Sequence, residues 1–217
     1  RLRMSDPSRT KQFIRRGLIV AAGGFAALAC ILFVRGFFAA RFERTTGRAA
    51  WIWPQHRIAA DEPLVFFAAK TFDLPAGRSY ARIKVAADPE YTLFFNGVEL
   101  GGGRSHDRVA IDVYDATALA RGSANRIVIA VRSARGVGGL LVAVDCGSML
   151  ENVVVSDASW EIYRSWSPRL LLAADPSAAS PRVLGRPPFG KWNYPVERPR
   201  AAYPAASDLV AARNVER

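Results

Sequence analysis

An uncharged, apolar run over residues 17–34 constrains this chain more than any other feature of its sequence. Arg35 interrupts the run, and residues 36–40 extend it with further uncharged side chains. A helix rises about 1.5 Å per residue, so about 20 apolar residues cross the hydrocarbon core of a bilayer. A buried helix of a soluble protein would show a polar stripe, and this run has none. The sequence therefore predicts one transmembrane helix over residues 17–40, with Arg35 reaching the lipid headgroups.

Lysine and arginine residues flank this run unequally. Six precede it, with Arg15 and Arg16 directly against it, whereas four lie in residues 35–48. Positive charge is favoured on the cytoplasmic side of a membrane. We therefore expect residues 1–16 to form a cytoplasmic basic segment and everything after the span to be periplasmic. Because the run is longer than the core of a usual signal peptide, we expect a retained anchor in a bacterial inner membrane.

Small residues spaced by four recur along the expected span. Such a face lets a second helix approach closely, although alanine and glycine are also simply common in membrane helices. The span contains no His, Asp or Glu, so it offers no ligand for a pigment or haem metal and no proton relay. If the face packs on other integral membrane subunits, its residues are Gly17, Ala21, Ala22, Gly23, Ala26 and Ala27.

The net charge of +11 lies at the two ends of the chain. Residues 49–167 hold 12 basic and 13 acidic side chains, so the middle is nearly neutral. A nucleic-acid-binding domain would more often carry a basic patch on its folded part, and we expect no nucleic-acid partner. The two cysteines, Cys30 and Cys146, and the two histidines, His56 and His106, argue against a disulfide scaffold, a metal site or a bound cofactor.

The middle of the chain consists of short apolar or alternating runs separated by turn residues. Asn96-Gly97 is a strong signal for a tight hairpin, and Gly101–Gly103 is expected to open a loop. No long amphipathic helix is present, and this spacing predicts a mainly β domain, an antiparallel jelly-roll β-sandwich over residues 50–166. The expected strands cover residues 64–72, 80–86, 91–95, 98–100, 109–113, 126–132, 140–144, 153–155 and 160–163.

Four segments in this region follow a recognisable order: WIW at residues 51–53, YTLFFNGV at 91–98, DATALARGSANRIVIAV at 115–131 and DASW at 157–160. This order resembles the galactose-binding-like jelly roll, an accessory domain of bacterial glycoside hydrolases, notably the amino-terminal domains of rhamnosidases. The resemblance covers roughly residues 50–165. It implies a β-sandwich that often binds carbohydrate and carries no catalysis itself.

The residues themselves indicate no catalytic machinery. No pair of carboxylates is marked for glycoside hydrolysis, and no nucleophile motif or phosphate-binding loop with its lysine is present. We therefore expect a protein that is not an enzyme. A loop of Arg104, Ser105, His106 and Asp107 could line a glycan site, and the alternative is an ordinary solvated hairpin loop.

Residues 167–217 contain 8 of the 13 prolines, which predicts an extended tail, while residues 41–49 are expected to be a linker. Aromatic and basic side chains are interleaved with the prolines, and a mere spacer rarely contains them. We expect the tail to bind a partner, with the alternative that it packs back on its own sandwich. The tail residues expected to bind are Phe189, Lys191, Trp192, Tyr194, Arg198 and Arg200.

Taken together, these features favour a non-catalytic, single-pass membrane protein that is an accessory or structural subunit of a larger bacterial membrane complex. Photosynthetic reaction-centre and light-harvesting assemblies have small subunits of this design, although no residue specifies such a complex. The alternative is a membrane-tethered carbohydrate-binding module, and a fragment of a glycosidase is the third interpretation.

Overall fold

The computed structural model describes residues 7–55, 62–78, 80–105, 110–147, 152–192 and 196–200, with side chains described from Val20 onward. The chain divides into two compact units, Arg1–Ala40 and Arg41–Arg217. The first unit is most of α1 (Pro7–Thr46), whose last six residues belong to the second unit. His56, His106, Asp107 and Tyr194, all named in the sequence analysis, lie outside the described residues.

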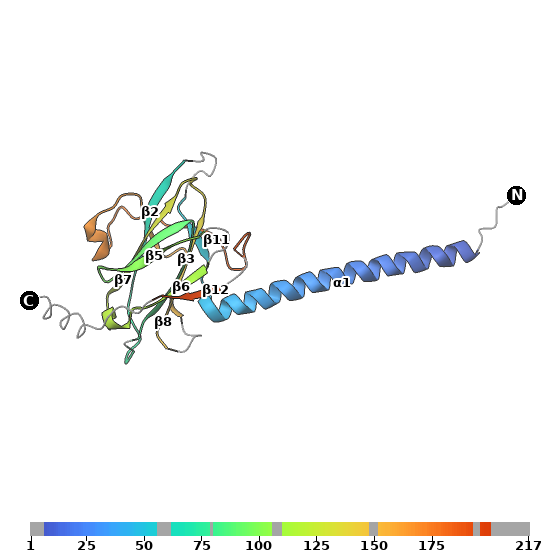
Figure 1. Ribbon diagram of the computed structural model, residues 1–217, viewed down its shortest axis with the longest axis horizontal. Coiled ribbons are helices and arrows are strands. Elements are labelled where there is room, and N and C mark those ends of the chain that lie inside the picture. The colour runs from blue at the N-terminus through green and yellow to red at the C-terminus, as the bar shows by residue number, and fades with distance from the viewer. Residues whose placement is uncertain are drawn as a thin grey trace, which may run out of the picture. The chain divides into compact units, whose positions relative to one another are not determined.

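Helix α1 confirms the predicted apolar helix and extends beyond it on both sides (Figure 1). Among the described residues, Val20–Thr46 is the one segment long and apolar enough to cross a membrane. Its mean hydropathy reaches 1.9 over an 18-residue window, and 0% of that window is buried. Length and composition thus permit a membrane span, and the crossing itself stays a prediction.

The second unit is a β-sandwich, as predicted, built from two sheets (Figure 1). In the seven-stranded sheet the order is β11-β1-β8-β3-β6-β12, with β9 paired to β8; in the five-stranded sheet it is β10-β2-β7-β4-β5. All pairings are antiparallel except that of β12 with β6. The strands are β1 (Trp51–Trp53), β2 (Leu64–Phe72), β3 (Arg82–Asp88), β4 (Glu90–Phe95), β5 (Val98–Arg104), β6 (Ala110–Asp115), β7 (Asn125–Ser133), β8 (Gly139–Asp145), β9 (Asn152–Val155), β10 (Glu161–Tyr163), β11 (Arg182–Gly185) and β12 (Val196–Pro199).

The core lies between the sheets and follows the two-residue alternation of the strands. Ile83 and Val85 of β3 are fully buried in it, facing Ile127 and Ile129 of β7 in the same cluster. The predicted hairpin at Asn96-Gly97 joins β4 to β5, and both turn residues have positive φ, which explains why this dipeptide is suited to the turn.

Each sheet also has an outer face that the chain itself covers. The end of α1 and the tail cover the seven-stranded sheet, where Phe42 and Trp192 join an apolar cluster with residues of β1, β3, β6 and β8. A segment containing the 3-10 helix η3 (Pro168–Leu171) covers part of the five-stranded sheet, with Leu170 packed in a second cluster. Apolar area is therefore buried in three places, between the two sheets and on the outer face of each sheet, and all three stabilise the domain.

Residues 41–49, expected to be a linker, are helical as far as Thr46 and packed on the sandwich. Phe42 is 3% exposed, Thr46 is 1% exposed and Ala49 is fully buried. The physical reason is that Phe42 extends the apolar face of α1 onto the sheet, where it is removed from water. No unstructured linker separates α1 from the sandwich.

The tail also differs from the expected extended segment, because two of its stretches join the seven-stranded sheet. Strand β11 pairs with β1, and β12 pairs with β6. Both lie at sheet edges, where a proline such as Pro199 does not interrupt a ladder of hydrogen bonds. The boundary expected at residue 166 therefore does not separate a domain from a tail.

Candidate functional site

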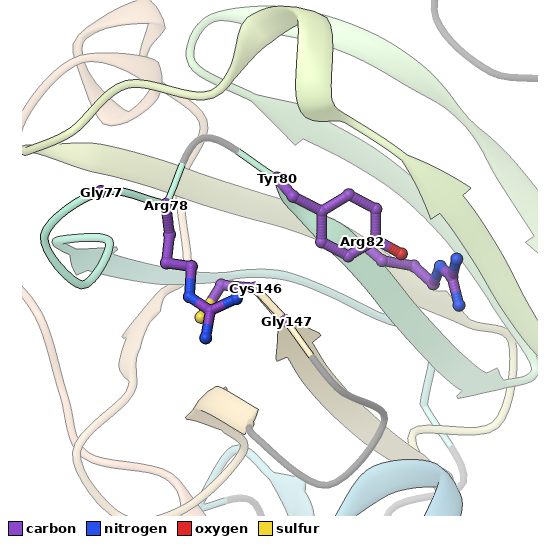
Figure 2. A pocket seen from close by; sticks show the side chains of 6 residues that line it. All are labelled: Gly77, Arg78, Tyr80, Arg82, Cys146 and Gly147. Atoms are coloured by element: carbon purple, nitrogen blue, oxygen red, sulfur yellow. The ribbon is translucent and has the colours of Figure 1, made fainter.

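A pocket of ≈ 520 Å³ opens where β3 begins and β8 ends (Figure 2). Arg78, Tyr80 and Arg82 are among its lining residues; in Figure 2 the Arg78 side chain extends toward Cys146, and that of Arg82 extends alongside Tyr80 in another direction. The Arg82 guanidinium carbon lies 5.3 Å from the centre of the Tyr80 ring. Burial raises the pKa of Tyr80, an effect that Arg82 partly opposes, so the phenol remains a hydrogen-bond donor at neutral pH. The complete lining is Gly77, Arg78, Tyr80, Arg82, Cys146 and Gly147.

The same strand β3 carries a buried lysine beside the end of α1. Lys84 is 1% exposed; its Nζ donates to the Thr45 carbonyl at 2.5 Å and pairs with Asp145 at 2.8 Å. Carbonyl groups in the last turn of a helix have no partner within the helix, and a cation there is favourable. Burial raises the pKa of the Asp145 carboxyl, and Lys84 opposes this. This contact fixes the last turn of α1 to the sandwich.

A second pocket, of ≈ 460 Å³, lies at one end of the five-stranded sheet. Glu90 stands in register between Arg132 of β7 and Arg104 of β5, and Arg104 pairs with Glu90 at 2.5 Å. Arg132 is exposed, and its side chain makes no hydrogen bond or ion pair with the described part of the chain. The pocket is lined by Pro63, Leu64, Val65, Pro89, Glu90, Arg104, Arg132, Ser133 and Ala134.

An exposed tryptophan lies further along the same outer face. Trp166 is 44% exposed, and its ring centre lies 5.1 Å from that of Phe67 and 5.6 Å from that of Phe94. Together, Trp166, Glu90, Arg104 and Arg132 are called the sheet strip below. An aromatic surface on the same sheet face as groups that donate and accept hydrogen bonds suits a polar ligand with an apolar face, such as a sugar ring.

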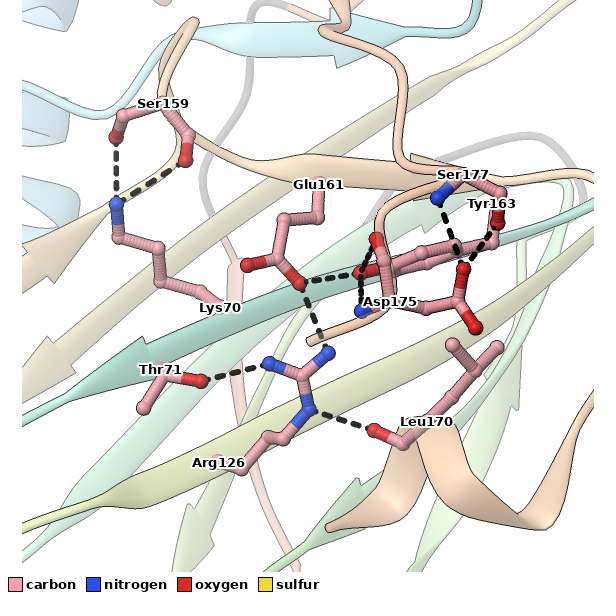
Figure 3. Close-up of polar contacts among 9 residues, drawn as sticks. All are labelled: Lys70, Thr71, Arg126, Ser159, Glu161, Tyr163, Leu170, Asp175 and Ser177. Carbon is pink, nitrogen blue, oxygen red and sulfur yellow. Dashed lines mark hydrogen bonds and ion pairs between the residues drawn. The ribbon is translucent and has the colours of Figure 1, made fainter. Parts of the chain in front are cut away.

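Arg126 holds the segment that carries Trp166 over the sheet (Figure 3). This guanidinium donates to the Leu170 carbonyl at 2.6 Å, to Thr71 Oγ1 at 2.6 Å and to Glu161 Oε2 at 2.8 Å. The Tyr163 hydroxyl donates to the same Glu161 oxygen at 2.7 Å. Arg126 is 2% exposed, so its charge is satisfied inside the domain and serves the fold.

The glycan loop expected from the sequence is only partly described. Arg104 belongs to β5 and pairs with Glu90, while the Ser105 hydroxyl donates to the Ala87 carbonyl at 2.7 Å. Sequence reasoning found Arg104 but missed Arg132 and Trp166. Register across β7, β4 and β5 brings Arg132 to Glu90, and a single sequence without strand pairing carries no signal for that.

The described tail residues contact the chain's own sandwich, the alternative that the sequence left open. The Trp192 indole is 8% exposed and donates to Asp88 Oδ2 at 2.8 Å, and Lys191 pairs with Asp88 at 2.6 Å. Phe189 is 39% exposed and its ring centre lies 6.1 Å from that of Trp192. Partner binding by the tail stays a prediction, and the exposed Phe189 and Lys191 are the tail side chains best placed for it.

Arg198 and Arg200 of the tail meet at one buried carboxylate, Asp112. Arg198 Nε donates to Asp112 Oδ1 at 2.5 Å, Arg200 donates a guanidinium N–H to Oδ2 at 3.1 Å, and the Tyr91 hydroxyl donates to Oδ2 at 2.6 Å. Burial raises the pKa of Asp112, but these hydrogen bonds outweigh it, and the pKa lies below its usual value. Gly103 makes room for the cluster, since a Cβ there would meet Asp112 and lie 2.7 Å from the Tyr91 ring. Residues 101–103, which were expected to open a loop, belong instead to β5.

The small residues of α1 named in the sequence analysis are solvent-exposed from Ala21 to Ala27, and Gly17 precedes the part of α1 whose side chains are described. Within the described residues, no group of three or more His, Cys, Asp or Glu side chains could hold a metal ion.

No protein-family model matches the sequence, and no curated protein matches it. Solved structures do resemble it. The similar structures include a GH78 family rhamnosidase of Bacillus sp. GL1 (23% identity, TM-score 0.62, covering 69% of this chain and 20% of that chain). Streptomyces avermitilis alpha-L-rhamnosidase complexed with L-rhamnose is also similar (21% identity, TM-score 0.57, 70% and 16%). A third is the lectin from Pleurotus ostreatus in complex with GalNAc (22% identity, TM-score 0.54, 69% and 47%).

The likeness is one of fold. This chain spans only 20% and 16% of the two rhamnosidases and 47% of the lectin. At these identities the comparisons support the fold, the β-sandwich that the resemblance implied. They do not assign the activities of the larger proteins to this chain.

Proposed function

We propose that this chain is a non-catalytic accessory subunit, anchored in a bacterial inner membrane by α1, whose periplasmic β-sandwich stabilises a larger membrane complex. One observation carries the proposal: α1 runs without a linker into the sandwich, where Lys84 binds the Thr45 carbonyl. A tethered binding module gains from a flexible linker that lets it search for its ligand. A chain without one suits a subunit that holds its domain beside neighbouring membrane proteins.

One further observation supports this function. The small residues of α1 from Ala21 to Ala27 are exposed, as the face of a helix that packs on another membrane subunit would be in an isolated chain. Nothing in the fold or in the comparisons favours photosynthetic assemblies over other membrane complexes.

The test is purification of the full chain from its membrane in a gentle detergent, with mass spectrometry of the proteins that co-elute. We expect partners in a fixed ratio, and fewer of them for Ala22→Leu combined with Ala26→Leu, because bulky residues keep helices apart. Val20→Ile combined with Val34→Ile is the matched control, because it enlarges two residues of α1 that are not small and should leave the number of partners unchanged.

A periplasm-specific reporter fused after Arg217 tests the orientation and should be active. Recovery of the chain without stoichiometric partners, or activity only of a cytoplasmic reporter, would contradict the proposal.

The sheet strip favours a second candidate function, a membrane-tethered carbohydrate-binding module. Trp166 offers a stacking surface, and Arg132 and Glu90 offer a donor and an acceptor for hydroxyl groups. The names of the lectin and the rhamnosidase both mention sugars, GalNAc and L-rhamnose.

A glycan array probed with the full chain in detergent separates the two functions. For an accessory subunit we expect no glycan bound more tightly than about 1 mM, roughly −4 kcal/mol. A specific glycan bound at micromolar concentration, and lost in Trp166→Ala and Arg132→Gln, would favour the carbohydrate-binding module. Phe189→Ala and Arg121→Gln are the controls, because they remove an exposed aromatic ring and an exposed charge outside the strip.

A further inference from the structure

The tail carries unpaired positive charge beside β11, the strand at one edge of the seven-stranded sheet. Residues 182–192 contain three basic side chains, Arg182, Arg186 and Lys191, and no Asp or Glu. Lys191 pairs with Asp88 at 2.6 Å. Arg182 and Arg186 are exposed, and neither guanidinium group makes a hydrogen bond or ion pair within the described part of the chain. Of the three charges, two therefore remain without a carboxylate.

Two apolar side chains of the same segment are exposed. Val183 is 44% exposed and follows Arg182 directly, and Phe189 is 39% exposed. Phe189 lies against the backbone of β11, because a Cβ at Gly185 would lie 2.7 Å from its ring. The same ring stacks on Trp192, with ring centres 6.1 Å apart. The name tail patch is used below for Arg182, Val183, Arg186, Phe189 and Lys191.

The hydrogen bonds around Phe189 hold this part of the tail patch in one conformation. Phe189 and Trp192 exchange backbone hydrogen bonds of 3.3 and 2.9 Å across a tight turn, in which Gly190 has a positive φ of 53°. The Trp192 indole donates to Asp88, and Lys191 pairs with the same carboxylate. A side chain that is already immobilised loses little further conformational entropy when a partner covers it. The exposed ring of Phe189 is therefore well suited to anchor a partner.

From these contacts we infer that the tail patch docks an acidic segment of a neighbouring protein subunit. Aromatic and arginine side chains are enriched in protein interfaces, which have polar rims. Carboxylates of the segment pair with Arg182 and Arg186, and its apolar side chains cover Phe189 and Val183. An acidic glycan would match the charge, but it has no apolar side chain to cover Val183. The inference rests on the proposed function as an accessory subunit, whose partner it describes.

Photo-cross-linking in intact membranes tests the docking. The photoreactive amino acid p-benzoylphenylalanine replaces Val183 in the full chain, and mass spectrometry identifies what becomes attached to it. The control variant carries the same amino acid in place of Leu172, which is 77% exposed and lies beside Gly97 at the turn between β4 and β5. We expect a product from position 183 that is absent from position 172, attached within a segment of net negative charge. Its yield should fall at about 1 M salt, where the screening length is about 3 Å.

Charge reversal supplies a second measurement. Arg182→Glu combined with Arg186→Glu should lower the yield from position 183 about tenfold, because like charges then face one another across the contact. Arg121→Glu combined with Arg169→Glu makes the same change in net charge at exposed arginines outside the tail patch, and it should leave the yield unchanged. Circular dichroism melting shows that each variant folds.

The inference would be overturned by a product no stronger at position 183 than at position 172, or by a yield that charge reversal leaves unchanged. Attachment to a glycan, a lipid or a segment without net negative charge would also overturn it. Co-elution in gentle detergent tests the proposed function separately. Subunits that co-elute without a product from position 183 would contradict the docking alone. An acidic segment attached at position 183 without co-eluting subunits would contradict the accessory function alone.

Discussion

The indole of Trp192 stacks on that of Trp51, with ring centres 4.5 Å apart and planes inclined by 26°. The two residues stand at opposite ends of the domain's sequence. Gly139 leaves room for both rings, since a Cβ at this position would lie 2.8 Å from each of them. The stack joins the tail to the first strand of the sandwich and makes the tail part of the fold.

Trp192→Ala should lower the free energy of unfolding by about 3 kcal/mol, because it removes a large, 8% exposed ring and leaves a cavity over Trp51. Chemical denaturation of the full chain in detergent, followed by circular dichroism, measures this change. Phe189→Ala is the control; that ring is 39% exposed, and its loss should be less than half as large. A loss for Trp192→Ala no larger than that for Phe189→Ala would show that the stack on Trp51 contributes no special stability, and no loss in either variant would show that these tail rings do not stabilise the domain.

Asp112→Asn should destabilise the fold by about 3 kcal/mol, because Arg198 and Arg200 lose their shared carboxylate. The pKa of Asp112 is lowered in the folded state, so its contribution to stability is present above the unfolded pKa of 3.8 and is lost as pH falls through the lower folded pKa. Wild type and variant should therefore differ clearly at pH 7 and converge below pH 3.8.

Urea denaturation at several pH values tests this convergence, with Glu99→Gln, an exposed carboxylate of β5, as the control. A difference between wild type and Asp112→Asn that does not depend on pH would show that the carboxylate charge is not what holds the tail arginines.

Lys84→Met alone should cost about 3 kcal/mol or more, because Asp145 is then buried without its cation. Asp145→Leu alone should also destabilise the fold, since Lys84 keeps only the Thr45 carbonyl. The double variant should lose less than the sum of the two, because a buried ion pair replaced by apolar side chains is often nearly neutral. Additive losses in this double-mutant cycle would mean that the pair is not coupled.

Gly103→Ala should destabilise the domain by about 2 kcal/mol, because the added methyl group meets the Asp112 carboxylate and the Tyr91 ring. Gly122→Ala is the matched control, since a Cβ at Gly122 meets nothing within 4 Å, and it should change stability by about 0.5 kcal/mol or less. Thermal melting of both variants gives the comparison, and similar midpoints would contradict the crowding described for Gly103.

Local pattern predicted much of this fold, and long-range pairing accounts for what it missed. The apolar run, the alternating segment around Ile127 and the Asn96-Gly97 turn are signals that a short stretch carries by itself. Lys84 alternates with apolar neighbours, a local pattern typical of a solvent-facing side chain; it is buried because the last turn of α1 covers that face. Strand register brings Arg132 to Glu90, and the segment that leads into η3 places Trp166 over Phe67 and Phe94; neither arrangement leaves a local trace in the sequence.

The two tail strands β11 and β12 are synthesised last, and this affects how the domain folds during translation. Strand β1 ends at Trp53, yet its neighbour β11 begins at Arg182, and β12 ends at Pro199. At about 5–20 residues per second, roughly 6–30 s of translation separate β1 from the strands that complete its sheet. During that interval the seven-stranded sheet lacks both of its edge strands and Trp51 lacks its cover. The domain therefore completes its folding only after Pro199 has left the ribosome, and a nascent chain stalled before Arg182 would expose apolar surface to chaperones and proteases.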